Sequence, residues 1–233
     1  MSKMVKVFIL LANICLPVFS IVLAIKYSAT PYRWLYSILI AIHVAARMWE
    51  TFFTSKERDP RKFEGDWTLA VGTFAYIALC FAITSEFFLI PRERCLGGFI
   101  VGSLLYLFAA RLRWWGQVTL GKQWAIHVVG DQKTKKKRLL QIGPYEFIRH
   151  PIYTGILIEE LALPLMASAY YAFFLVFLVN IPLLLIRLRE EENRSLLNFR
   201  EDYARYAKKT GRFFPPMRRY FQFLKKVIFD VSR

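Results

Sequence analysis

Four apolar runs fill the first half of the chain, at about residues 5–25, 34–54, 67–90 and 96–115. A helix of roughly 20 residues crosses about 30 Å of hydrocarbon, because each residue advances it by about 1.5 Å. Hydrophobic residues make up 56% of the 233 residues and aromatic residues 17%, which is more apolar than a typical soluble domain. The sequence therefore predicts an all-α integral membrane protein with about four transmembrane helices.

A fifth apolar stretch, residues 152–186, is too long for one straight span. As a single helix it would measure roughly 50 Å. Pro164 and the Ala-Ser-Ala-Tyr stretch at 167–170 can interrupt it, because proline removes a helical hydrogen bond. We therefore expect a C-terminal helical hairpin formed by residues 151–166 and 170–192.

Basic residues are concentrated in two segments. The net charge is +16, and most of the excess lies in residues 111–150 and 187–233. Cytoplasmic loops of multi-pass membrane proteins are enriched in Lys and Arg, so we expect both segments and both termini to be cytoplasmic. The run Lys135-Lys136-Lys137-Arg138 could bind nucleic acid, but anionic lipid explains it with fewer assumptions, so no nucleic-acid partner is expected.

No internal repeat or Gly/Ser-rich linker divides the chain, so residues 1–233 are expected to form one membrane-embedded domain. Within it we distinguish N-terminal spans at 1–95, a core at 96–216 and a basic amphipathic tail at 217–233. The apolar N-terminal run is long and lacks a convincing cleavage site, so we expect it to be retained.

Cysteine and histidine spacing gives no sign of a metal site. Cys15, Cys80 and Cys95 form no CxxC pair, and the three histidines are far apart in sequence. Neither a disulfide framework nor a bound metal is predicted.

Polar side chains gather in the segment Gly143–Gly155, between two prolines and directly before the hairpin. Each proline disfavours helical geometry for the residue before it, so His150 cannot lie inside a helix, whereas Pro151 can occupy a first helical turn. The ring of His150 and the phenols of Tyr145 and Tyr153 should then lie near a helix N-terminus, where anionic or polar ligands bind favourably.

The second hairpin helix ends with a basic and acidic run, in which Arg187 and Glu191 are four residues apart on one face. The guanidinium fork suits a carboxylate or phosphate, and the glutamate can accept hydrogen bonds from an amine or hydroxyls. A surface ion pair is the alternative. Both motifs fall at the same end of the hairpin, which favours a shared site.

Two adjacent carboxylates, Glu159 and Glu160, lie inside the apolar first helix of the hairpin. Ionised groups are costly there and are usually paired or functional. Two roles are open for these glutamates. They could pair with Arg111 or Arg113, or they could form a cation-selecting wall of the substrate pocket. The aromatic face of the helix around residues 199–206 is expected to pack on the membrane interface, so Tyr206 is expected to act in packing.

These motifs resemble the isoprenylcysteine carboxyl methyltransferases, their bacterial relatives and the phospholipid methyltransferases. The family pattern has a Gly-x-Tyr turn, Arg-His-Pro-x-Tyr-x-Gly, a helical hairpin, an Arg followed by Glu-Glu, Tyr-x-x-Tyr and a Pro. The corresponding residues are Gly143–Gly155, Arg187–Glu192, Tyr203–Tyr206 and Pro215. The resemblance covers about residues 111–216 and includes Leu120–Trp124 and His127–Val129. The chain departs from the pattern at Arg200, where the family usually has Gly, and at Gly130, where eukaryotic members tend to have Gln.

The resemblance implies methyl transfer from S-adenosyl-L-methionine to a lipid-borne acceptor, in a cofactor pocket on the cytoplasmic face. By similarity, Arg187 and Glu191 are the catalytic residues, and Arg187 faces the acceptor carboxylate. Glu159 and Glu160 are not part of the family pattern; from their position in the hairpin they are assigned to substrate binding together with Arg187. The residues implied in cofactor binding are Leu139, Leu140, Tyr145, His150, Pro151, Ile152, Tyr153 and Glu191.

Other acceptors and other classes of protein remain open. A phospholipid amine is the second candidate acceptor, since Glu159 and Glu160 could favour an amine. A nicotinamide-dependent sterol-type reductase shares a similar Arg-His-Pro turn, but such enzymes typically have more spans. A non-enzymatic channel or assembly factor would not bind the cofactor.

Overall fold

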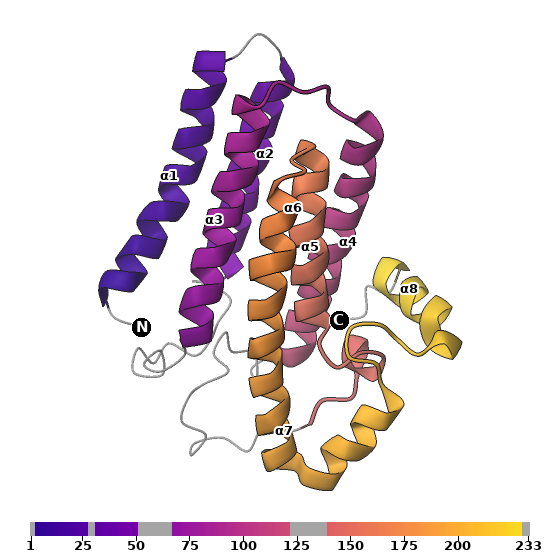
Figure 1. Cartoon of the computed structure of the whole chain (residues 1–233). Helices are drawn as coiled ribbons and strands as arrows, with labels where there is room; N and C mark the ends of the chain where they lie inside the picture. Colours follow the sequence, from indigo (N-terminus) through magenta and orange to yellow (C-terminus); the bar gives the residue numbers. More distant parts are fainter. Residues whose placement is uncertain (1–2, 28–30, 51–66, 122–138, 230–233) are drawn as a thin grey trace.

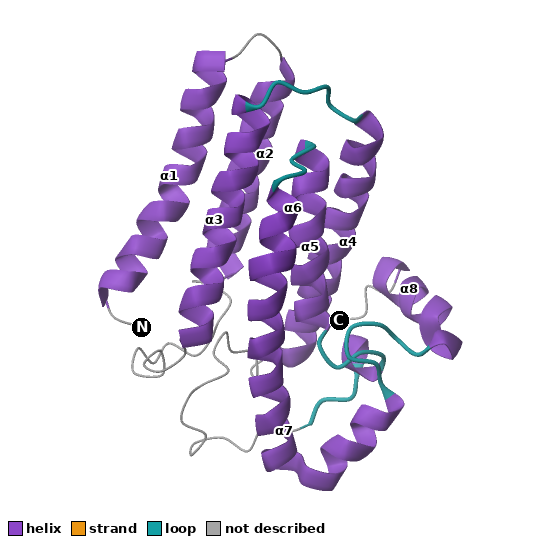
Figure 2. Cartoon of the chain, viewed as in Figure 1, coloured by secondary structure: helices purple, strands orange, loops and turns teal. Residues whose placement is uncertain are grey.

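The computed structural model describes residues 3–27, 31–50, 67–121 and 139–229, and the regular elements in these ranges are helices, with no β-strand (Figure 2). The predicted all-α fold is confirmed. The His127 motif and the basic run at 135–138 lie outside the described residues.

Four long helices form the first half of the molecule and run alternately in opposite directions (Figure 1). They are α1 (Lys3–Tyr27), α2 (Pro31–Trp49), α3 (Trp67–Leu89) and α4 (Leu96–Leu120). Each corresponds to one of the four predicted apolar runs. α1 packs on α2 and α3, and the main partner of α4 is the first helix of the hairpin.

Four helices of the described residues are long and apolar enough to cross a membrane: Val7–Tyr27, Trp67–Leu89, Leu96–Leu120 and Ala172–Lys209. Four apolar helices of this kind indicate an integral membrane protein. These four helices differ from the four predicted spans in one respect: α2 is not among them, and the second helix of the hairpin is. Arg33, His43 and Arg47 reduce the hydropathy of α2.

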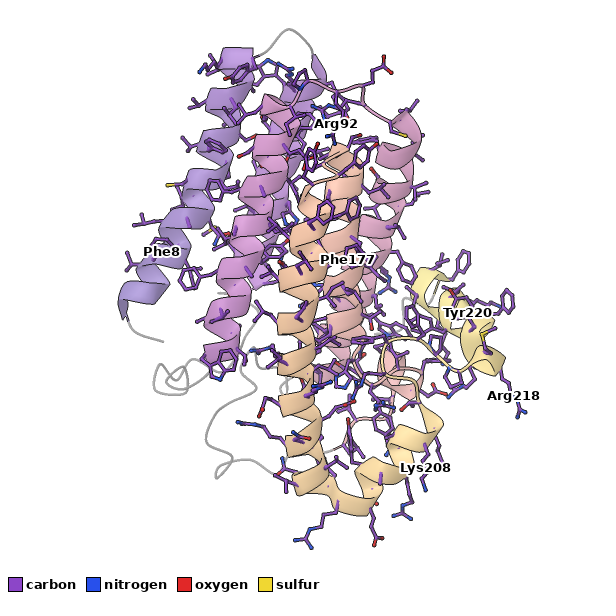
Figure 3. The ribbon with its side chains drawn as sticks, viewed as in Figure 1. Phe8, Arg92, Phe177, Lys208, Arg218 and Tyr220 are labelled. Carbon is purple, nitrogen blue, oxygen red and sulfur yellow. The ribbon has the colours of Figure 1, made fainter. Side chains whose placement is uncertain are left out.

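Charged and apolar side chains are separated along the bundle. Figure 3 shows Arg92 at one end, Lys208 and Arg218 at the opposite end, and Phe8 and Phe177 on the flanks between them. Phe8 is 56% exposed and Phe177 57% exposed. Exposed aromatic flanks between charged ends are typical of a helix bundle surrounded by lipid.

The hairpin consists of α5 (Pro151–Ala167) and a long second helix. The second helix is continuous through α6 (Ala172–Leu175), the π-helical segment Val176–Asn180 and α7 (Ile181–Lys209). The break follows Ala167, where Ser168 adopts a left-handed conformation with φ of 52°. Pro164 lies inside α5 and does not end it. The predicted hairpin is confirmed. Its turn lies in the stretch at 167–170 and not at Pro164.

A glycine allows α5 to pack closely on α4. A Cβ atom at Gly155 would come within 2.9 Å of the Ala109 carbonyl oxygen and would collide with the Arg113 side chain. Small residues at such positions let membrane helices approach each other. The last residue of the family motif therefore fixes the hairpin against the fourth helix.

α7 changes direction sharply at Arg200. This residue has φ of 43° and ψ of −116°, a conformation that strains any side chain with a Cβ. The turn directs the end of α7 back toward the start of α5, and both Tyr203 and Tyr206 are 5% exposed. The position at which the family usually has Gly is thus the position at which the helix bends.

Replacing Arg200 with glycine should stabilise the protein by about 1 kcal/mol, because glycine adopts positive φ without strain. Chemical unfolding in mixed micelles would measure the change. Glu201→Gly is the matched control, because this neighbouring exposed residue has helical geometry, so the substitution should destabilise by about 1 kcal/mol. Equal destabilisation by both substitutions would contradict the strain at Arg200.

The C-terminal helix α8 (Tyr220–Phe229) packs beside the turn that precedes α5. Phe223 and Val227 join a buried cluster with Phe147 and Ile148. Glu146 is paired with Arg219 and with Lys226, the latter at 3.4 Å. Partial burial raises the pKa of the Glu146 carboxyl, but the two cations outweigh it and lower the pKa overall.

The attachment of α8 should weaken in acid. Since the pKa of Glu146 is lowered in the folded protein, its contribution is complete above the ordinary carboxyl pKa of about 4.3 and is lost as the pH falls through the lowered value. Hydrogen exchange of α8 amides can be followed from about pH 6 downward. After division by the intrinsic exchange rate at each pH, the protection of these amides should decrease in acid. Glu146→Gln should remove this acid dependence, and an unchanged acid dependence would disprove the role of Glu146.

Candidate functional site

The site lies at the end of the bundle where the proline-containing turn meets α7. The turn begins with a short 3₁₀ helix, Gly143–Glu146, and ends at His150, whose φ of −128° is not helical. Pro151 is the first residue of α5, as expected. Gly143 has φ of 60° and lies against Thr119 of α4, so this glycine cannot be replaced without strain.

Glu192 connects the turn to α7. Its Oε1 atom lies 3.1 Å from Nε2 of His150 and accepts hydrogen bonds from Nε of Arg149 at 3.3 Å and Nε of Arg212 at 3.2 Å. Arg212 also donates to the second carboxylate oxygen. One carboxylate therefore holds the turn, α7 and the segment after α7 together.

Sequence reasoning selected Glu191 and overlooked Glu192. A signal was present, because Leu184, Leu188 and Glu192 are spaced by four residues and all lie on the buried face of α7. A carboxylate that continues an apolar stripe is expected to have a buried partner.

The segment after the bend in α7 covers the turn. Arg149 donates to the carbonyl oxygens of Ala207 at 2.9 Å and Thr210 at 2.6 Å, and its backbone N–H donates to Gly211 at 2.9 Å. The Tyr206 hydroxyl donates to the carbonyl oxygen of Tyr145 at 2.7 Å. Tyr206 thus packs over the turn, and the predicted placement of its helix on the membrane interface stays a prediction.

Arg187 and Glu191 of α7 lie beside the first turn of α5. Nε of Arg187 donates to the Tyr153 hydroxyl at 3.1 Å, and another guanidinium nitrogen donates to the Thr68 hydroxyl of α3 at 3.0 Å. The Glu191 carboxylate interacts with the phenols of Tyr153 and Tyr145. The structure therefore brings together four residues that the sequence analysis selected, and α3 adds Thr68, which it did not.

Tyr145 provides a neutral phenol at the site. Burial, and then the negative charge of Glu191, raise the pKa of Tyr145 well above its ordinary value. The hydroxyl therefore remains protonated at physiological pH and is available as a hydrogen-bond donor.

The remaining predicted cofactor residues border the same region. Leu139 and Leu140 are half-buried and lead directly into the turn. Pro151 and Ile152 are buried at the start of α5 and lie against Gly116 of α4. Their roles in cofactor binding remain predictions.

Glu159 lies outside this cluster, in a buried ion pair. Its side chain is 1% exposed and accepts a hydrogen bond from Arg113, as one of the two alternatives from the sequence anticipated. Nε of Arg47 lies 3.7 Å away, and the Tyr76 hydroxyl donates to Oε1 at 2.6 Å. Two cations, Arg113 and Arg47, therefore face Glu159, and both also pair with Glu50.

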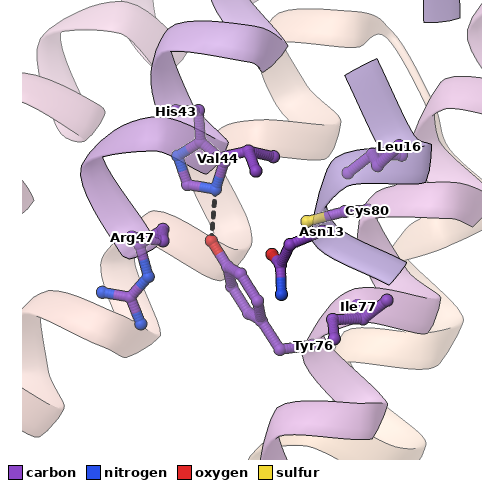
Figure 4. Close-up of a pocket in the computed structure, with 8 residues that line it drawn as sticks. All are labelled: Asn13, Leu16, His43, Val44, Arg47, Tyr76, Ile77 and Cys80. Atoms are coloured by element: carbon purple, nitrogen blue, oxygen red, sulfur yellow. Dashed lines mark hydrogen bonds between the residues drawn. The ribbon is translucent and has the colours of Figure 1, made fainter. Parts of the chain in front are cut away.

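A small pocket lies between α1, α2 and α3 (Figure 4). Tyr76, which lines this pocket, connects it to Glu159 by a hydrogen bond. Because the Tyr76 hydroxyl donates to Glu159, its oxygen accepts from Nε2 of His43, and Nδ1 of His43 lies 2.8 Å from the Tyr106 hydroxyl. Nε2 of His43 therefore carries a proton. The pocket residues are Asn13, Leu16, His43, Val44, Arg47, Tyr76, Ile77 and Cys80.

Glu160 points to a different neighbour. Its Oε1 atom accepts a hydrogen bond from the amide of Asn180 at 3.1 Å, across the hairpin. The assignment of Glu159 and Glu160 to substrate binding remains a prediction. Within the described ranges, no group of three or more His, Cys, Asp or Glu residues could hold a metal ion.

Comparison with known families supports the motif assignment. Residues 102–197 match the isoprenylcysteine carboxyl methyltransferase family. The matched segment contains α5, the turn before it, and Arg187 to Glu192 of α7. The resemblance inferred from the motifs is confirmed, and the members of this family are methyltransferases.

The chain is also similar to a Bacillus subtilis (strain 168) protein described as "Uncharacterized protein YpbQ". The two are 35% identical over 83 residues, which cover 35% of this chain and 46% of the relative. The chain thus spans about half the length of the curated relative it matches.

Proposed function

We propose that the protein transfers a methyl group from S-adenosyl-L-methionine to a lipid-borne carboxylate, most closely a prenylcysteine. The observation that carries this proposal is the meeting of Arg187 and Glu191 of α7 with Tyr153, in the first turn of α5 directly after the proline-containing turn. The family match over these residues supports the same reaction. The basic end of the bundle, which holds the site, is proposed to face the cytoplasm.

The side chains at the site suit this cofactor. S-adenosyl-L-methionine combines a cationic sulfonium, an amino group, a carboxylate and hydroxyls. The Glu191 carboxylate can hold a cationic group, and the protonated phenols of Tyr145 and Tyr153 can donate hydrogen bonds. Leu139, Leu140, His150, Pro151 and Ile152 are proposed to complete the cofactor site.

Arg187 is proposed to orient the acceptor. Its guanidinium fork suits a carboxylate, and its hydrogen bonds to Tyr153 and Thr68 hold the side chain in one orientation. When bound, the cofactor would supply a methyl group on a sulfonium. Its sulfur leaves as a neutral thioether, so no acid is needed to assist the leaving group. The residues therefore accelerate the reaction chiefly by positioning the two substrates and excluding water.

Methyl transfer can be tested with the purified protein in lipid nanodiscs, methyl-labelled cofactor and farnesylcysteine analogues. A base-labile product that releases methanol indicates a methyl ester, as we expect. A base-stable lipid product would instead identify an amine acceptor. Tight binding of NADPH, with no binding of S-adenosyl-L-methionine, would overturn the proposal in favour of a reductase.

Variants of Arg187 and Glu191 should separate acceptor turnover from cofactor binding. Glu191→Ala should abolish cofactor binding in calorimetry while the protein stays folded. Arg187→Ala should lower acceptor turnover by about 10²-fold, because the carboxylate loses its orientation, with a smaller effect on cofactor affinity. Arg189→Ala, at an exposed position of the same helix, is the control. Equal loss of both properties in Arg187→Ala would refute this division of roles.

A further inference from the structure

Two polar contacts join α5 to α7 along one seam. Arg187 of α7 donates to Tyr153 of α5, and Asn180, at the end of the π-helical segment, donates to Glu160 of α5, each at 3.1 Å. The contacts are seven residues apart on both antiparallel helices, which is about two turns or roughly 10 Å. The second contact therefore lies deeper in the bundle, directly behind the proposed methyl-transfer site.

Both members of the deeper pair are buried and incompletely hydrogen-bonded. Glu160 is 4% exposed and Asn180 is 5% exposed. In the part of the chain that the structure describes, Oε2 of Glu160 and Oδ1 of Asn180 have no hydrogen-bond partner. Both atoms are acceptors, so what the pair needs is a donor.

The surroundings provide little compensation for a negative charge on Glu160. Glu159, its neighbour on α5, is itself negative and is bonded to Arg113. Arg47 of α2 and Cys80 of α3 also interact electrostatically with Glu160. Arg47, however, is hydrogen-bonded to Glu50 at 2.7 Å and lies 3.7 Å from Glu159. The hydrogen bond to Glu160 comes from a neutral amide, and an ionised carboxylate in such a setting is costly.

We propose that Glu160 is held as the neutral acid, whose Oε2–H donates to Oδ1 of Asn180 and completes a two-bond acid–amide pair that sets the register of α5 against α7. A single proton supplies both missing partners, since it converts Oε2 into a donor and gives Oδ1 its hydrogen bond. Buried polar pairs are well suited to fixing helix register. Glu160 and Asn180 thereby act as positioning residues for Tyr153 and Arg187.

The backbone near Asn180 is adapted to this pairing. The N–H of Ile181 donates to the carbonyl oxygen of Val176, five residues earlier, as in a π-helix. Pro182 follows and has no N–H to donate to the carbonyl of Leu178. π-helical turns shift the residues after them around the helix axis and often occur at functional sites. Here the π-helical turn ends at the residue that faces Glu160.

The substitution Glu160→Gln tests the protonation state. Glutamine is neutral and has an N–H where the acid would have its O–H, so it can form the same two hydrogen bonds with Asn180. Glu160→Ala should lower the unfolding midpoint in mixed micelles, and Glu160→Gln should restore most of that loss. If glutamine is as damaging as alanine, the carboxylate charge is needed and the proposal fails.

Infrared spectroscopy provides a second, independent readout. The protein should show a carboxylic-acid C=O stretch that persists over the pH range in which exposed carboxylates are ionised. This band should be missing from Glu160→Gln and shifted in Asn180→Ala. An identical spectrum in wild type and Glu160→Gln would overturn the proposal whatever the activity of the protein.

The kinetic part of the proposal rests on the proposed methyl transfer. Asn180→Ala should lower the turnover number several-fold with little change in cofactor affinity, because the positions of Tyr153 and Arg187 change relative to each other. If no methyl transfer is found at all, the stability and infrared results still decide whether the acid–amide pair exists. An unchanged turnover number in a folded Asn180→Ala protein would disprove the positioning role.

Discussion

Replacing Glu192 with alanine should destabilise the protein by about 3 kcal/mol and strongly weaken binding of the proposed cofactor, because three cationic or hydrogen-bonding side chains lose one shared partner. His150, Arg149 and Arg212 all contact this carboxylate, which is 12% exposed. Loss of these contacts should release the proline-containing turn from α7. Unfolding in mixed micelles and calorimetry with the cofactor would measure the two effects.

Glu190→Ala is the matched control for this prediction. Glu190 belongs to the same acidic run but is exposed on α7, so its replacement should change stability by less than about 0.5 kcal/mol. If Glu190→Ala and Glu192→Ala were equally mild, Glu192 would not connect the turn to the helix.

Replacing Glu159 with alanine should be the most destabilising single substitution in the interior, at about 3–5 kcal/mol. The side chain is 1% exposed and is bonded to Arg113 and Tyr76. Its removal leaves the Arg113 charge, which is also buried, with reduced compensation. Chemical unfolding would measure the loss.

The double substitution Glu159→Leu with Arg113→Met tests the cause. Removing both charges should recover most of the stability that Glu159→Ala loses, because the cost comes from an uncompensated buried charge. Additive destabilisation by the two single substitutions would instead show that the residues act independently.

The positions of the helices could be predicted closely from the amino-acid sequence. Each predicted apolar run became a helix because its length and composition favour helices in lipid, where backbone groups must be satisfied internally. The turn at His150 and the start of α5 at Pro151 were also predicted, since proline restricts its own backbone and that of the residue before it.

The sequence determined the helices, the hairpin and the polar turn before it, because these depend on local backbone restrictions and on the length of apolar runs. Only the tertiary structure decided that Glu192 is the partner of His150 and that Thr68 holds Arg187. It also decided that Glu159 faces Arg113 whereas the adjacent Glu160 faces Asn180. Adjacent residues on a helix point in directions about 100° apart, so their partners depend on which helices pack on each side, and neighbouring glutamates are indistinguishable until that packing is known.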